Sequence, residues 1–149
     1  MELEEAIKQK KFRSEHEKMM VNIIYTNGWL GGQQVHLFKP YGLSQQQYNI
    51  LRILRGQHPD PASVSLLMDR MLDKMSNASR LVEKLRQKDL VSRQECKHDR
   101  RQVDVLITEK GLATLEEIDA QLEQVFEGMS TLTIEEAQEV NRLLDKLRG

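Results

Sequence analysis

Apolar residues recur every three or four positions along most of this chain, which is the spacing of helices with one buried face. A long first helix is predicted over about residues 5–38, ended by Pro40 and Gly42. Near the other end, Thr108 is expected to cap a fifth helix, and Thr133 with Glu136 to open a last one. Their apolar positions are Leu112, Leu115, Ile118, Leu122, Val125 and Met129 in the fifth helix and Ala137, Val140, Leu144 and Leu147 in the last.

Shorter helices are predicted between the long ones, and each begins near a residue that can cap a helix. Ser44 with Gln47 has the spacing of a capping box, and Ser63 or Ser65 is expected to cap a third helix that runs through Met71. A fourth helix is predicted over residues 76–88, apolar on one face and polar on the other. The apolar stripe comprises Ala78, Leu81, Val82 and Leu85, and the opposite face carries Asn77, Arg80 and Lys84.

Two strand-like runs follow this helix, at residues 90–93 and 103–107, and a charged turn separates them. The turn contains Cys96, Lys97, His98, Asp99, Arg100 and Arg101. A helix followed by a β-hairpin with an arginine-rich tip can place the helix in a DNA major groove and the tip in the neighbouring minor groove. We therefore expect a mainly helical protein with a small β-hairpin wing that binds double-stranded DNA.

Four motifs occur in an order and spacing that resemble the MarR family of bacterial transcription regulators. They are residues 41–51 (YGLSQQQYNIL), 79–85 (SRLVEKL), 99–101 (DRR) and 106–111 (LITEKG). The resemblance implies a single winged helix-turn-helix domain over residues 1–149, with a DNA-binding lobe at about 44–108 and dimerisation helices at about 1–38 and 109–149. It also implies a homodimer that regulates promoters, more often as a repressor than as an activator, and often responds to a small phenolic or other lipophilic effector. Because the chain has no apolar run of eighteen residues and its acidic start is unlike a signal peptide, we expect it to be cytoplasmic.

The outer helices are expected to pack against a second copy of the chain. Their apolar stripes exceed what the small DNA-reading module can cover, and burial against a symmetry mate would remove them from water. The alternative is that they fold back on their own monomer. In the dimer, two recognition helices would lie about 34 Å apart, one turn of B-DNA, and the operator would be a pseudo-palindrome.

The net charge of −1 is distributed unevenly along the chain. Residues 1–69 carry 8 basic and 7 acidic side chains, residues 70–110 carry 11 and 7, and residues 111–149 carry 3 and 9. The positive excess therefore lies on the proposed DNA-reading segment and the negative excess on the C-terminal helices. Attraction to phosphates depends on the local patch more than on the total, because salt screens charges over about 10 Å at 0.1 M.

The predicted DNA contacts lie at and around the start of the fourth helix. Short polar side chains near a helix start, together with unpaired backbone N–H groups, suit a phosphate. Arg80 can reach a guanine edge with two parallel hydrogen bonds, whereas Lys84 is better suited to phosphate. For each residue the alternative is a solvated surface side chain. The predicted contacts in this segment are Lys74, Ser76, Asn77, Ser79, Arg80 and Lys84.

The predicted wing adds Asp99, Arg100 and Arg101 to the DNA-binding residues. Residues two apart in an extended turn project to the same side, so the Asp99 carboxylate can hold the Arg101 guanidinium in one pose. The resemblance makes Arg101 the minor-groove residue and leaves Arg100 for the DNA backbone. The alternative is an ordinary surface ion pair.

Three features depart from the family pattern. Asp89 stands after the fourth helix, where glycine is usual, although aspartate tolerates a left-handed backbone better than most residues. Residues 72–75 (LDKM) lack the glycine that often relaxes the turn between the two helices of the motif. Gly28, Gly31 and Gly32 interrupt the first helix, and a kink or the close approach of another backbone or ligand would explain them.

An effector pocket is predicted from aromatic and polar residues on the helices that line the usual family pocket. Tyr25, Trp29, His36 and Tyr48 could surround a flat lipophilic acid or phenol. The alternative is that these aromatics belong to the core. The residues do not identify the ligand.

Other chemistries are not indicated by the sequence. The four histidines, His16, His36, His58 and His98, lack the spacing of a helical metal site, and the single cysteine excludes an intrachain disulfide. We expect no enzyme activity, no metal and no cofactor, because no phosphate loop, nucleophile elbow or pair of catalytic carboxylates is recognisable. The chain contains no apolar run of eighteen residues, so no membrane partner is expected. The alternative function is a dimeric protein-interaction module without specific DNA recognition.

Overall fold

The computed structural model describes residues 1–95, 103–128 and 131–149, which form a mainly helical chain with one small antiparallel sheet. Its elements run in the following order: α1 (Leu3–Ala6), α2 (Glu15–Phe38), the 3-10 helix η1 (Lys39–Tyr41), α3 (Gln45–Gln57), β1 (Ala62–Ser63), α4 (Val64–Arg70), α5 (Ala78–Arg86), β2 (Val91–Glu95), β3 (Val103–Ile107), α6 (Glu109–Gly128) and α7 (Ile134–Arg148).

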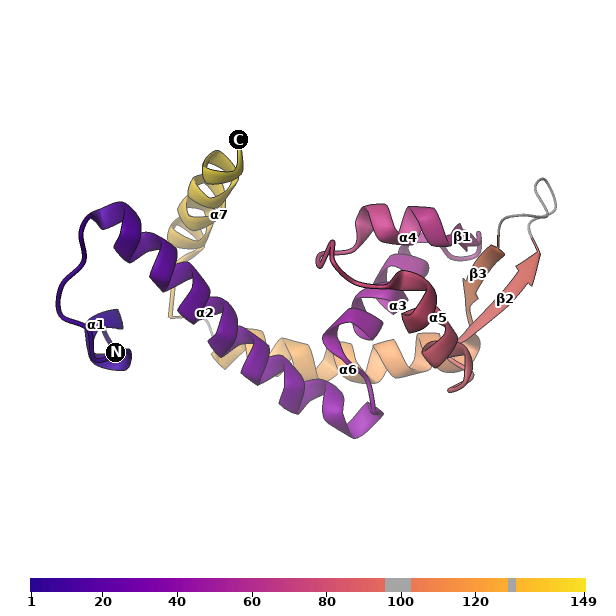
Figure 1. Cartoon of the computed structure of the whole chain (residues 1–149). Helices are drawn as coiled ribbons and strands as arrows, with labels where there is room; N and C mark the ends of the chain where they lie inside the picture. The colour runs from indigo at the N-terminus through magenta and orange to yellow at the C-terminus, as the bar shows by residue number, and fades with distance from the viewer. Residues whose placement is uncertain (96–102, 129–130) are drawn as a thin grey trace.

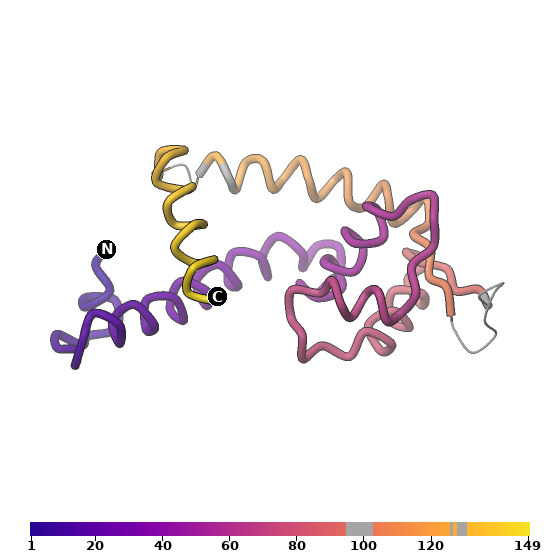
Figure 2. Tube along the Cα trace, turned by 90° about the horizontal axis from the view of Figure 1, so that it is seen from above, coloured from indigo at the N-terminus to yellow at the C-terminus, as the bar shows by residue number. Residues whose placement is uncertain are grey.

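The elements form a compact lobe with two long helices that extend from it (Figure 1). Helices α3, α4 and α5 and the three strands make the lobe, and α2 and α6 run from it in the same general direction (Figure 2). Helices α1 and α7 lie at the end that is remote from the lobe. In the described part of the chain, no helix is long and apolar enough to cross a bilayer.

The start of the first long helix differs from the prediction. Helix α2 begins at Glu15, where the Ser14 hydroxyl accepts a hydrogen bond from the Glu17 backbone N–H at 3.1 Å. Residues 3–6 form a separate short helix, which a 2.5 Å ion pair between Glu4 and Lys18 joins to α2. The predicted start near residue 5 was therefore wrong, because Ser14 caps the helix and α2 begins ten residues later, at Glu15.

The predicted end of α2 is confirmed, whereas no close contact within the described residues accounts for its glycines. Pro40 lies in the 3-10 turn η1, and Gly42 follows with a left-handed φ of 62°. Helix α2 continues through Gly28, Gly31 and Gly32, and a Cβ added at any of them would meet no atom within 4 Å. No part of the described chain approaches these glycines closely.

The lobe confirms most of the predicted caps and adds one strand. Ser44 and Gln47 form both hydrogen bonds of the capping box, and Ser63, rather than Ser65, caps α4 by accepting from the Leu66 N–H. Strand β1 was not predicted. It pairs with β3 through Ala62 and Val105, which places β3 between β1 and β2 in the sheet.

The core lies where α3 crosses α5, the sheet and the first half of α6. Phe38 at the end of α2 stacks on Tyr48 of α3 with the ring centroids 4.4 Å apart, so the first long helix is anchored to the lobe. Arg55 of α3 and Asp119 of α6 add an ion pair at 2.5 Å on the outside of the same junction. The largest fully buried side chains are Phe38, Ile50, Leu51, Leu54, Leu67, Met71, Val82, Leu85, Val105, Leu115 and Ile118.

Candidate nucleic-acid interface

Helix α5 presents one apolar and one basic face, as predicted. Ala78, Val82 and Leu85 are buried in the core, whereas the Arg80 and Lys84 side chains are exposed. The helix is shorter than the predicted 76–88, because the Asn77 side chain caps it by accepting from the Arg80 backbone N–H at 3.0 Å. It ends at Arg86.

The chain after α5 takes the left-handed backbone that the sequence indicated. Asp89 has a φ of 59°, and it is one of two non-glycine residues with a positive φ in the described chain. The turn lets Leu90 re-enter the core, and β2 begins at the next residue, Val91. Strands β2 and β3 then pair in register from Val91 with Ile107 to Glu95 with Val103.

The turn before α5 is held by a carboxylate rather than relaxed by a glycine. Asp73 accepts hydrogen bonds from the Met75 backbone N–H at 3.0 Å and the Ser76 hydroxyl at 2.9 Å. These bonds, with a weaker one from Gln46, hold the pKa of Asp73 below its usual value. The backbone of Leu72 also donates to the Asn49 side chain at 2.9 Å. Helix α3 and Asp73 thus determine where α5 begins.

The predicted DNA contacts in this segment divide into two groups. The Ser76 and Asn77 side chains are engaged in the turn and the cap, and the Lys74 ammonium donates to the Asp69 carbonyl. Ser79, Arg80 and Lys84 are exposed, and among the described residues no acid forms an ion pair with Arg80 or Lys84. Only the second group therefore presents side chains without a partner in the described chain. Contact of either group with DNA stays a prediction.

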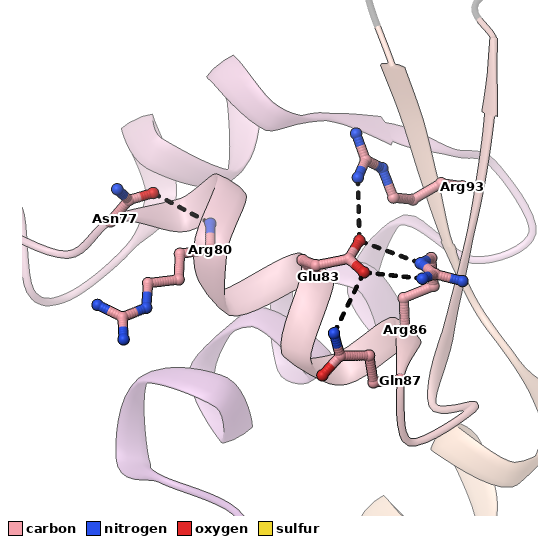
Figure 3. Close-up of polar contacts among 6 residues, drawn as sticks. All are labelled: Asn77, Arg80, Glu83, Arg86, Gln87 and Arg93. Carbon is pink, nitrogen blue, oxygen red and sulfur yellow. Dashed lines mark hydrogen bonds and ion pairs between the residues drawn. The ribbon is translucent and has the colours of Figure 1, made fainter.

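A cluster around Glu83 was not predicted from the sequence. Glu83 accepts two hydrogen bonds from Arg86, at 3.0 and 2.7 Å, one from Arg93 of β2 at 3.2 Å and one from Gln87 at 3.4 Å (Figure 3). The Arg86 guanidinium is the main cause that lowers the pKa of Glu83 to about 2. The three-residue spacing of Glu83 and Arg86 could have indicated their pairing. Arg93 reaches the carboxylate only because the fold places β2 beside α5.

The predicted wing residues lie outside the described residues. This applies to Asp99, Arg100 and Arg101 and also to Cys96. Strands β2 and β3, which flank this segment, are described and have the predicted antiparallel pairing.

A cavity of about 400 Å³ lies between the C-terminal half of α2, α3, the turn before α5 and α6. Of the four predicted pocket residues, only Tyr48 lines it. Tyr25, Trp29 and His36 are exposed on α2 and do not line the cavity. Its lining comprises Gln34, Phe38, Gln45, Tyr48, Asn49, Arg52, Ile53, Leu72 and Leu122.

Two polar atoms at this cavity are buried without a hydrogen-bond partner in the described chain, the Tyr48 hydroxyl and the Gln34 side-chain oxygen. Burial raises the pKa of Tyr48, and the nearby Arg52 guanidinium opposes this shift. Buried polar groups usually have a partner, so a bound molecule or water would complete these two. The sequence could not indicate Gln34 or Arg52, because nothing in the local pattern shows which helix faces meet.

Comparison with known families gives the same assignment as the motifs. Residues 41–102, which contain α3 to β2, match the model of the MarR family. In this segment the chain is similar to the MarR family. Its mainly helical fold with a three-stranded antiparallel sheet is the winged-helix fold of MarR regulators.

Similarity to individual MarR regulators covers most of the chain. The transcriptional regulator MgrA of Staphylococcus aureus is 29% identical over 111 residues, which are 74% of each chain. The structure of a MarR transcription factor from Planctomyces limnophilus is 29% identical, with a TM-score of 0.69 over 91% of this chain and 98% of that one. The structure of BpsR from Bordetella bronchiseptica, whose DNA binding is regulated by 6-hydroxynicotinic acid, has a TM-score of 0.74 at 23% identity and covers 93% and 97% of the two chains.

Proposed function

We propose that this protein is a MarR-family regulator that binds double-stranded DNA sequence-specifically through α5 and acts as a repressor. The observation that carries the proposal is the basic face of α5. Arg80 and Lys84 are exposed there, without an acidic partner among the described residues, while Ala78, Val82 and Leu85 fix the opposite face in the core. An arginine on the exposed face of such a helix can bind the major-groove edge of guanine.

The rest of the lobe supports this role for α5. The cap at Asn77 and the turn around Asp73 hold the start of the helix, so Arg80 projects from a rigid element. The β2–β3 hairpin lies beside the helix, where it can follow the DNA backbone into the next groove (Figure 1). The predicted wing contacts of Asp99, Arg100 and Arg101 are part of this proposal.

Salt titration of duplex binding tests the proposal. We expect the logarithm of the binding constant to fall linearly with the logarithm of salt concentration, by about 0.9 for each phosphate contacted. Arg80→Ala should also reduce the preference for the operator over random duplex. A protein that is folded but binds no duplex would instead be the alternative, a protein-interaction module.

We also propose that the protein acts as a homodimer. Helix α7 contains no buried residue, although its apolar side chains occupy one face at helical spacing. Helix α2 exposes Met20, Ile24 and Trp29 in the same chain. Covering these faces with a second copy would stabilise the dimer by roughly 25 cal/mol for each Å² of apolar surface. The exposed apolar residues of α7 are Ile134, Val140, Leu143 and Leu147.

A second candidate function is regulation by a small aromatic acid or phenol in the cavity beside Tyr48. The cavity combines apolar walls with the unpartnered Tyr48 hydroxyl, the Gln34 oxygen and the Arg52 guanidinium. A hydroxylated aromatic carboxylate has complementary groups for all three. This chemistry is the same as that of 6-hydroxynicotinic acid, which regulates BpsR.

Isothermal titration calorimetry with 6-hydroxynicotinic acid tests this candidate, because it measures binding to the protein directly. Tyr48→Phe and Arg52→Gln should weaken binding roughly tenfold, whereas the matched change Tyr25→Phe, outside the cavity, should leave it within about twofold. Equal effects of the two tyrosine substitutions would place any binding elsewhere.

A further inference from the structure

Helix α5 carries one acidic residue, Glu83, beside the basic residues Arg80, Lys84 and Arg86. A carboxylate on a helix that approaches DNA repels the phosphates, so its presence there opposes binding. A free carboxylate could offset this cost by accepting a hydrogen bond from cytosine. Whether Glu83 can do so depends on what already occupies its oxygens.

Both oxygens of Glu83 are fully occupied within the protein. One oxygen, Oε1, accepts from Arg86 Nη2 at 2.7 Å and from Gln87 Nε2 at 3.4 Å. The other, Oε2, accepts from Arg86 Nε at 3.0 Å and from Arg93 Nη1 at 3.2 Å. Four donors match the roughly four acceptor positions of a carboxylate. Glu83 therefore has no acceptor position left for a hydrogen bond from a DNA base.

The cluster also withholds two arginines from solvent anions. Arg86 uses Nε and Nη2, one edge of its guanidinium, on Glu83, and Arg93 is drawn from β2 toward the same carboxylate (Figure 3). One negative charge is thus shared by two positive ones between α5 and β2. Arg80 extends away from the cluster and shares none of these contacts (Figure 3). Helix α5 therefore carries one restrained arginine, Arg86, and one arginine that is available for contact, Arg80.

We propose that Glu83 limits sequence-independent binding to DNA by holding Arg86 and Arg93 away from the phosphates. On α5, contact with DNA then depends on Arg80 and Lys84, of which Arg80 can recognise a base. Specificity is the ratio of the affinity for the operator to the affinity for random sequence. A group that lowers binding to random sequence therefore raises specificity. Glu83 is in this sense a specificity-determining residue, and its role rests on the DNA binding proposed above.

The variant Glu83→Gln tests the proposal, because glutamine keeps the size of the side chain and removes its charge. Glu139→Gln is a matched control. Glu139 holds Arg142 on α7 with the same three-residue spacing and two hydrogen bonds, at 2.7 and 2.6 Å, but away from the lobe. Both variants raise the net charge by the same amount and break the same kind of ion pair.

We expect Glu83→Gln to bind a random-sequence duplex roughly tenfold more tightly at 0.1 M salt and to steepen the salt dependence by about one to two units, as one or two more phosphates are contacted. Its preference for the operator should fall. Glu139→Gln should stay within about twofold of the unmodified protein. Adding Arg93→Gln to Glu83→Gln should reverse at least part of the gain, because Arg93 is one of the released groups.

Arg93→Gln alone provides a second test that does not require Glu83→Gln to fold. If Arg93 is restrained as proposed, its removal leaves the salt dependence of random-duplex binding unchanged. A decrease of about one unit would identify Arg93 as a phosphate contact and overturn the proposal. A folded Glu83→Gln protein that binds random duplex no more tightly would overturn it too. If the unmodified protein showed no salt-dependent binding to any duplex, the proposed DNA binding itself would be rejected.

Discussion

Replacing Gly111 by alanine should destabilise the protein, although alanine is the better helix former. Gly111 is buried in the first turn of α6, next to the chain that leaves α5. A Cβ added there would lie 2.4 Å from the Leu90 carbonyl oxygen and 2.7 Å from Ile107 Cγ1. The Leu90 carbonyl cannot move freely, because it accepts the Thr108 backbone N–H at 3.1 Å.

The size of the effect follows from two opposing contributions. The gap to the Leu90 oxygen is about 1 Å shorter than ordinary contact, so backbone must shift, and overpacking of this kind costs about 3 kcal/mol at the upper end of its usual range. The gain in helix propensity from glycine to alanine is at most about 1 kcal/mol. We therefore expect a net loss of about 2 kcal/mol in the free energy of unfolding.

Gly56→Ala is the matched control, since Gly56 is exposed in α3 and a Cβ there would meet nothing within 4 Å. It should stabilise the protein by about 0.5 kcal/mol through helix propensity alone. Thermal and urea unfolding at one fixed protein concentration would measure both, with a fall in Tm of about 4 to 8 °C for Gly111→Ala. A change of stability in the same direction for both substitutions would show that the contact with the Leu90 carbonyl does not determine the effect at Gly111.

Three further predictions address the interface and the lobe. Lys84→Ala should weaken duplex binding evenly across sequences and reduce the salt slope by about one. Arg80→Ala should instead cost about 1 to 3 kcal/mol of binding free energy at the operator and relax the sequence preference of the protein. Competition binding with operator and random duplex distinguishes these effects. Because the folded pKa of Glu83 is about 2, below its usual 4.5, its contribution to stability is present above pH 4.5 and is lost as the pH falls toward 2. Acid titration of unfolding should therefore show a smaller loss over this range in Glu83→Gln than in the unmodified protein, and equal losses would contradict the assignment. Breaking the Arg55–Asp119 pair with Asp119→Asn should cost less than about 1 kcal/mol, because both side chains are about one-third exposed, and a larger loss in urea unfolding would mean that the pair holds the lobe on α6.

The features that the sequence predicted correctly depend on residues close together in the chain. The capping boxes at Ser44 and Thr133 are examples, because each is a contact between residues three positions apart. The left-handed turn at Asp89 and the apolar face of α5 are also local, since they follow from residue type and helical spacing. These signals were sufficient to order the helices and the hairpin.

Features that join distant parts of the chain were decided only by the tertiary structure. Strand β1 has two residues, too few for a period, and exists because β3 lies beside it. Arg93 binds Glu83 because β2 returns along α5, and Gly111 is required because α6 passes the Leu90 carbonyl. The cavity at Tyr48 likewise forms where four segments meet, and of the four residues predicted for an effector pocket only Tyr48 lines it. Such contacts depend on which faces of the elements pack together, and spacing along one segment contains no information about the segment that packs against it.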